Sequence, residues 1–268
     1  MTLFDVLLVA LIQGLGEVLP LGASGPLAAF PVLAGTPEGR AALSVAAHVG
    51  ILLALAAYFW RDVGAMAAGV WKMLKGKPDS GSHLFLHVLA GTLPAAVAGW
   101  YLMDQMAGRF GPGAIAAFIL GGGVLLLVCD KLGVTVRRIE HMGFPSSIGL
   151  GLLQIASMIP GASRTGIIIT IARLMGWERQ AAARFALLLA MPMILGHASV
   201  TFWRLTRQTD VILSTDLAIA AAAAGLAALL AVAGMMAWVE RRTFLPLAMA
   251  RILVGAGALA WVVLSGRG

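Results

Sequence analysis

The chain reads QGLGEVLPLGASG at residues 13–25 and QIASMIPGASRTG at residues 154–166, and both stretches interrupt otherwise apolar segments. Each stretch has a Gln, then a Pro, then Gly-Ala-Ser, and ends on a Gly. The first contains the acid Glu17 and the second contains the base Arg164. Because a carboxylate and a guanidinium are costly at membrane depth, the two stretches indicate a functional site within a bilayer.

The composition is that of a membrane protein along the whole chain. Of the 268 residues, 60% are hydrophobic and 12% are charged, whereas a soluble domain carries about 25% charged residues. Apolar runs of about 20 residues, the length that crosses a bilayer, recur from end to end. The net charge of +7 comes from basic residues in short loops, which is a topology signal rather than a sign of nucleic-acid binding.

Hydropathy predicts an all-α polytopic fold with two kinds of segment. Two apolar segments, roughly 3–33 and 146–175, are broken in the middle by Pro and small residues. Broken backbone at membrane depth is tolerated only where it is buried in protein or lines a wet cavity, so we predict that both are re-entrant helical hairpins. The remaining apolar segments predict six full crossings, at roughly 41–60, 84–103, 114–130, 184–203, 217–239 and 246–264.

Loop charge predicts the orientation. Of the 19 Lys and Arg residues, five fall on one side and two, Arg164 and Arg251, fall inside the spans. The other side carries the excess and is predicted to be cytoplasmic, with Arg61, Lys72, Lys75, Lys77, Lys131, Arg137, Arg138, Arg173, Arg179, Arg184, Arg241 and Arg242. The first hairpin then opens from the outer face and the second from the inner face. Because an odd number of spans separates them, residues 1–133 and 144–268 form an inverted-topology repeat, which predicts a central binding site.

The second interruption has the composition of a phosphate site. Residues Gly161 to Gly166 offer a Gly-rich backbone, the hydroxyls of Ser163 and Thr165, and the planar fork of Arg164. If a helix begins here, its N-terminus adds partial positive charge. Together these groups predict an anion site suited to phosphate.

The first interruption supplies the acidic half of the predicted site. Gln13 and Glu17 are four residues apart and therefore share one face of a helix. Ser24 adds a hydroxyl, and neighbouring glycines add weaker donors. In an alternative interpretation Glu17 and Arg164 only pair with each other, although buried ion pairs are a poor source of stability.

Two other polar residues in the spans, His48 and Arg251, have two interpretations each. His48, near the outer end of the first span, is either a hydrogen-bonded core histidine or an auxiliary catalytic group. Arg251, near the cytoplasmic end of the last span, either snorkels or reaches an anion. His197 is interpreted as structural. The sequence contains no metal-binding motif such as HExxH or paired Asp residues.

At these motifs the chain resembles the undecaprenyl-pyrophosphate phosphatase family, also called bacitracin-resistance proteins. The resemblance runs nearly end to end, through HVGIL at 48–52, FWR at 59–61, AMPM at 190–193 and FLP at 244–246. It implies a protein of the bacterial inner membrane whose site opens to the periplasmic face. The implied activity is removal of the terminal phosphate from a polyprenyl pyrophosphate, which recycles the lipid carrier for cell-envelope synthesis. A divalent cation, Mg or Ca, and a homodimer are further implications.

The resemblance assigns roles and also shows departures. Gln13 and Glu17 match the family's paired acidic or amide positions, and the Ser163–Arg164 pair matches its phosphate-binding pair. The family serine proposed as nucleophile falls on Ala23, and the family histidine falls on Pro26.

Two functions follow from these matches and departures. In the first, the protein is a phosphatase with a rearranged site, in which Glu17 acts as base on water or on Ser24 and His48 replaces the missing histidine. In the second, it is a catalytically impaired homologue that binds polyprenyl phosphate or moves it between leaflets. Phosphate release in detergent discriminates between them.

Overall fold

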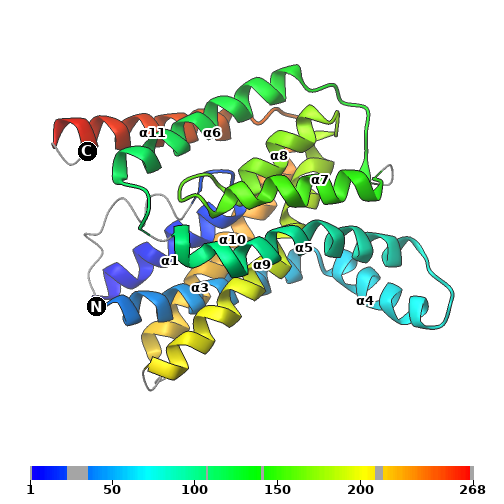
Figure 1. The fold of residues 1–268 in the computed structure, drawn as a ribbon, viewed down its shortest axis with the longest axis horizontal. Helices are drawn as coiled ribbons and strands as arrows, with labels where there is room; N and C mark the ends of the chain where they lie inside the picture. The colour runs from blue at the N-terminus through cyan, green and yellow to red at the C-terminus, as the bar shows by residue number, and fades with distance from the viewer. Residues whose placement is uncertain (1, 23–35, 107, 140–141, 209–213, 266–268) are drawn as a thin grey trace.

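The computed structural model describes residues 2–22, 36–106, 108–139, 142–208 and 214–265 (Figure 1). Within these ranges the chain is helical and contains no strand, apart from one isolated bridge between Arg137 and Trp177. The elements in chain order are α1 (Leu3–Val18), α3 (Pro37–Tyr58), α4 (Trp60–Leu74), α5 (Ser80–Met106), α6 (Pro112–Leu132), α7 (Phe144–Gln154), the 3-10 turn η2 (Ile155–Met158), α8 (Arg164–Leu174), α9 (Arg179–Gln208), α10 (Thr215–Val239) and α11 (Leu245–Leu264).

Six of the described helices are long and apolar enough to cross a bilayer: α3, α5, α6, α9, α10 and α11. The six predicted crossings and the all-α polytopic class are therefore confirmed. Helix α3 packs mainly against α10, and α6 packs against α11 along one edge of the molecule (Figure 1).

The second broken segment enters and leaves at the same end. Helices α7 and α8 have 11 residues each, so each is about 16 Å long and too short for a hydrocarbon core of about 30 Å. The loop before α7 pairs with the loop after α8: Val136 and Arg137 donate backbone N–H groups to the Gly176 carbonyl (3.1 and 2.9 Å), and Glu178 N–H donates to the Arg137 carbonyl (2.8 Å). This pairing supports the predicted re-entrant hairpin.

The first broken segment meets the second. Helix α1 ends at Val18, and the chain turns through Gly22, which has a φ of +78°. A Cβ on Gly22 would lie 2.9 Å from the Gly161 carbonyl oxygen, so only glycine allows this approach. The rest of the predicted first hairpin, including Ser24, lies outside the described residues.

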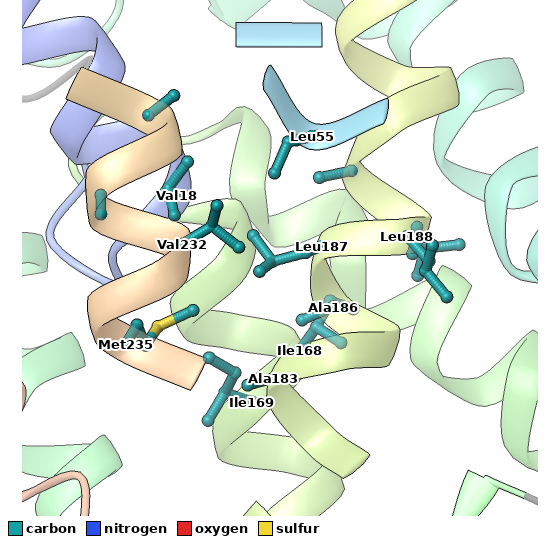
Figure 2. Close-up of a cluster of buried hydrophobic side chains, with 14 of the residues drawn as sticks. Val18, Leu55, Ile168, Ile169, Ala183, Ala186, Leu187, Leu188, Val232 and Met235 are labelled. Carbon is teal, nitrogen blue, oxygen red and sulfur yellow. The ribbon is translucent and has the colours of Figure 1, made fainter. Parts of the chain in front are cut away.

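A buried apolar cluster holds α8 and α9 against the surrounding helices (Figure 2). Ile168 and Ile169 of α8 and Leu187 of α9 are fully buried in it. Val18 at the end of α1 and Val232 of α10 complete the contact. The ends of both broken segments are thus fixed by the same core.

Helix α4 was not predicted, because its charged residues suggested a cytoplasmic loop. It packs against the start of α5, where Gly69 and Gly81 leave no room for a Cβ between the two backbones. At 15 residues it is shorter than a span. At the turn between these helices Lys72 Nζ lies 2.7 Å from the Asp79 carboxylate, and this hydrogen bond lowers the pKa of Asp79 to about 2.

Two of the cations counted in the loop-charge pattern, Arg173 and Arg179, belong to an ion network around Asp130. Arg173, one of the cations placed on the predicted cytoplasmic side, has a side chain with 0% exposure. Asp130 Oδ1 accepts from Arg173 Nε (2.9 Å) and Arg179 Nε (2.8 Å), and its Oδ2 accepts from Phe244 N–H (3.0 Å). Because the network joins the ends of α6, α8, α9 and α11, it fixes the base of the second hairpin.

Candidate functional site

A cavity of about 950 Å³ lies where both interruptions face the spans. Its polar walls come from α1, α3, α8 and α9, and its apolar walls come mainly from α5 and α9. The lining residues are Gln13, Gly16, Glu17, Gly22, Ser44, His48, Ala96, Gly99, Trp100, Ser157, Met158, Pro160, Ser163, Arg164, Pro192, Met193, Gly196, His197, Ser199, Val200, Trp203 and Arg204.

The acid and the base of the two interruptions lie next to each other in the lining of this cavity. Glu17 Oε2 lies 3.7 Å from Arg164 Nη1, which is an ion pair but not a hydrogen bond. Both Nε and Nη1 of Arg164 are buried without a hydrogen-bond partner. A buried donor without a partner is costly. These two donors are not hydrogen-bonded to Glu17, so they are available to an anion in the cavity.

Ser163 starts α8 in a strained conformation at the cavity wall. It is the one non-glycine residue with positive φ (61°) among those described, and such strain concentrates at functional sites. Its Oγ accepts the N–H of Gly166 at 3.2 Å and caps the helix. The first N–H groups of α8 remain without intrahelical partners and add to the field that favours an anion.

The other predicted phosphate-binding residues lie behind this wall and do not line the cavity. Thr165 Oγ1 donates to the Glu17 carbonyl at 2.6 Å and ties α8 to α1. The Gly161 carbonyl accepts from Arg251 at 3.0 Å, and Gly166 leaves room for that guanidinium. These three positions shape the wall through packing and internal hydrogen bonds.

Arg251 neither snorkels nor lines the cavity. It is 1% exposed and donates to the carbonyls of Pro20 (3.2 Å), Gly161 (3.0 Å) and Ala162 (2.7 Å), and to Ile119 of α6 (3.1 Å). One guanidinium thus holds both interruptions together. This role needs contacts from three distant parts of the chain and has no local signal in the sequence.

Gln13 and His48 are joined through a serine that the sequence did not single out. Gln13 Nε2 donates to Ser44 Oγ at 3.0 Å. His48 Nδ1 lies 2.7 Å from the Ser44 carbonyl and 3.4 Å from its hydroxyl. Gln13 Oε1 is buried without a partner. The i, i+4 spacing of Ser44 and His48 on one helix face was the available signal.

His197, interpreted from the sequence as structural, lies against His48. The ring centroids are 5.2 Å apart and the planes are inclined by 60°. Both rings line the cavity that Glu17 and Arg164 line.

The described residues do not form a metal site of their own. They contain no cluster of three or more His, Cys, Asp or Glu side chains placed to hold an ion. Glu17 is the one carboxylate among the lining residues. A cage built from protein ligands therefore does not fit this part of the chain.

The fold and the site define a class: polytopic helical membrane proteins with a polar cavity between two broken segments. Comparison with known proteins is consistent with this class. The family model described as "Bacitracin resistance protein BacA" matches residues 6–257, and the chain belongs to this family.

Relatives cover the chain nearly from end to end. An "Undecaprenyl-diphosphatase 1" of Paramagnetospirillum magneticum is 63% identical over 262 residues, covering 98% of each chain. An "Undecaprenyl-diphosphatase 1" of Rhodospirillum rubrum is 45% identical over 97% of this chain and 95% of its own. An "Undecaprenyl-diphosphatase" of Geobacter metallireducens is 35% identical over 94% and 95%.

Proposed function

We propose that this protein hydrolyses undecaprenyl pyrophosphate to undecaprenyl monophosphate and inorganic phosphate. The observation that carries the proposal is Arg164, whose Nε and Nη1 are buried without partners at the wall of a cavity that also contains Glu17. The relatives' names point to the same activity. The reaction recycles the lipid carrier used in cell-envelope synthesis.

Each lining group has a role in this hydrolysis. Arg164, together with Ser163 and the N-terminus of α8, binds the pyrophosphate and offsets charge that develops in the transition state. Glu17 takes a proton from the attacking water as its oxygen bonds to the terminal phosphorus. Gln13 donates to Ser44 and so joins the walls that α1 and α3 contribute to the cavity. Ser24 remains a candidate nucleophile outside the described residues.

Mg²⁺ or Ca²⁺ would depend on the substrate's own oxygens for most of its ligands, because Glu17 is the one carboxylate among the described lining residues. Pyrophosphate oxygens and water supply most ligands to such ions where a protein offers few carboxylates. None of the residue roles given above depends on such an ion.

We also propose the membrane arrangement that the sequence predicts. Residues 1–133 and 144–268 form inverted repeats in the bacterial inner membrane, and the cavity opens to the periplasmic face. The loop pairing at Gly176 supports the re-entrant half of this arrangement. A homodimer is compatible with it.

Phosphate release by purified protein in detergent, with undecaprenyl pyrophosphate as substrate, tests the function. We expect robust turnover that Glu17→Gln lowers about 10²- to 10⁴-fold, because the base is lost. Glu38→Gln, an exposed substitution in the first turn of α3, should leave turnover unchanged. A silent wild type that still binds the lipid would overturn the phosphatase proposal in favour of a carrier that binds or translocates polyprenyl phosphate.

A further inference from the structure

Two imidazoles share the cavity with the proposed phosphate-binding groups and have no role in the steps above. His48 comes from the middle of α3 and His197 from α9. Their ring centroids are 5.2 Å apart. Each ring also lies within electrostatic range of Glu17 and Arg164. The pair is therefore part of the site rather than of the surrounding core.

The hydrogen bonds of His48 determine which nitrogen is free to exchange a proton. Its Nδ1 lies 2.7 Å from the Ser44 carbonyl oxygen. Because a carbonyl oxygen only accepts, Nδ1 carries a proton and donates it there. Nε2 is then the nitrogen that binds or releases a second proton. The Gln13–Ser44 hydrogen bond of 3.0 Å anchors the residue that holds the ring.

The hydrolysis needs a proton donor that the groups assigned so far do not supply. Glu17 receives a proton on the side of the attacking water, and the guanidinium of Arg164 does not release one. The leaving lipid phosphate gains an electron pair on its bridging oxygen. Without protonation this developing charge opposes bond breaking.

The histidine pair supplies the two imidazoles of the described cavity lining, and imidazole is the side chain that most often acts as a general acid or base. The charged side chains facing it are Glu17 from α1, Arg164 from α8 and Arg204 from α9. Helix α10 contributes nothing to the described lining, and the lining residues of α5 do not titrate: Ala96, Gly99 and Trp100.

We propose that His48 and His197 form the proton-donating pair that acts as general acid in this hydrolysis, an inference that rests on the proposed function. The imidazolium donates its proton to the bridging oxygen while the bond from that oxygen to the terminal phosphorus breaks. The electron pair of that bond stays on the leaving oxygen. The water oxygen forms the new bond to phosphorus, and its proton goes to Glu17.

The pair holds one proton in the competent state, because two adjacent imidazolium cations repel each other. After product release the proton on Glu17 passes through solvent to the neutral pair and restores the starting state. Rising pH removes the imidazolium proton, so the rate falls on the alkaline side.

Steady-state kinetics of His48→Gln, His197→Gln and the double variant test the pair, since Gln retains hydrogen bonding but does not titrate. We expect kcat to fall about 10²- to 10⁴-fold with little change in KM, and the alkaline limb of the kcat profile to disappear. The double variant should lose little more than either single variant, because the two rings act as a unit. His83→Gln, an exposed substitution at the start of α5, is the matched control.

Added imidazole separates lost chemistry from lost folding. A folded His197→Ala variant leaves a gap in the cavity wall, and imidazole should restore a measurable part of its turnover. Single variants that keep both kcat and the alkaline limb would overturn the pair as general acid while the proposed function stands. Failure of imidazole to rescue, together with lowered thermal stability, would also overturn it. A wild type without hydrolysis would overturn both proposals, so the two failures are distinguishable.

Discussion

Replacing Arg251 with Met should separate the two broken segments without touching a residue that lines the cavity. Arg251 is 1% exposed and donates to four backbone carbonyls from three parts of the chain. Three of these carbonyls, on Pro20, Gly161 and Ala162, lie in non-helical backbone. In a membrane protein such groups need a partner within the protein. Met fills a similar volume but donates nothing.

The expected loss follows from these three carbonyls. A buried polar group left without its partner costs about 1–3 kcal/mol, so three cost about 3–9 kcal/mol. The cavity borders Pro160 and Gly22, and water entering from it would satisfy some of the freed oxygens. We therefore expect the lower end, about 3 kcal/mol, in the free energy of unfolding.

Equilibrium unfolding in mixed detergent, followed by tryptophan fluorescence, measures this loss. Phosphate release should fall in parallel, because Ser163 and Glu17 lie on the two segments that separate. The control is Arg61→Met, an exposed arginine whose guanidinium lies 5.3 Å from the Trp60 ring centre, with an expected change within about 0.5 kcal/mol. An Arg251→Met protein with unchanged unfolding energy and unchanged turnover would refute the clamp.

Three further predictions use the same assays. Arg164→Lys should raise KM and lower kcat for phosphate release, because a point charge cannot replace the planar fork; unchanged kinetics would argue against a phosphate at Arg164. Asp130→Asn should lower the unfolding free energy by about 3–5 kcal/mol, because it leaves Arg173 buried without its counterion; a change below 1 kcal/mol (about a fivefold shift in equilibrium) would contradict this. Gly50→Ala should lower the unfolding free energy, because a Cβ there would collide with the α10 backbone at the α3–α10 contact. Gly64→Ala, where a Cβ would meet nothing within 4 Å, should be neutral or slightly stabilising. Equal changes in unfolding free energy for the two variants would refute the packing argument.

Much of the architecture could be predicted because it depends on features that lie close together in the sequence. Six apolar runs of bilayer length predicted six spans, and all six are present. Pro and Gly at the two interruptions predicted breaks in the helices at Val18 and before Arg164, where the structure has them. The cost of charge in a bilayer indicated a functional site at Glu17 and Arg164, and the structure brings both side chains to one cavity.

The sequence did not predict the partners of its charged residues. The positive-inside pattern counted Arg173 on the cytoplasmic side, and only the structure shows that its side chain is buried on Asp130, 43 positions away in the chain. Helix α4 was not predicted, because its charges obscured the face that packs on α5. Both features were missed because a charged residue can pair with a distant residue, and hydropathy does not report such partners.

The sequence by itself determined the membrane class, the six spans, the two interruptions and the acid and base within them, because hydropathy and Pro/Gly placement act over a few residues. The tertiary structure alone decided which polar groups share one cavity. It placed His197 against His48, left Nε and Nη1 of Arg164 without a hydrogen-bond partner, and gave Arg251 the backbone carbonyls of both interruptions as partners. These outcomes depend on how α3, α8, α9 and α11 pack, and packing between helices distant in the chain has no periodic signal in a single sequence.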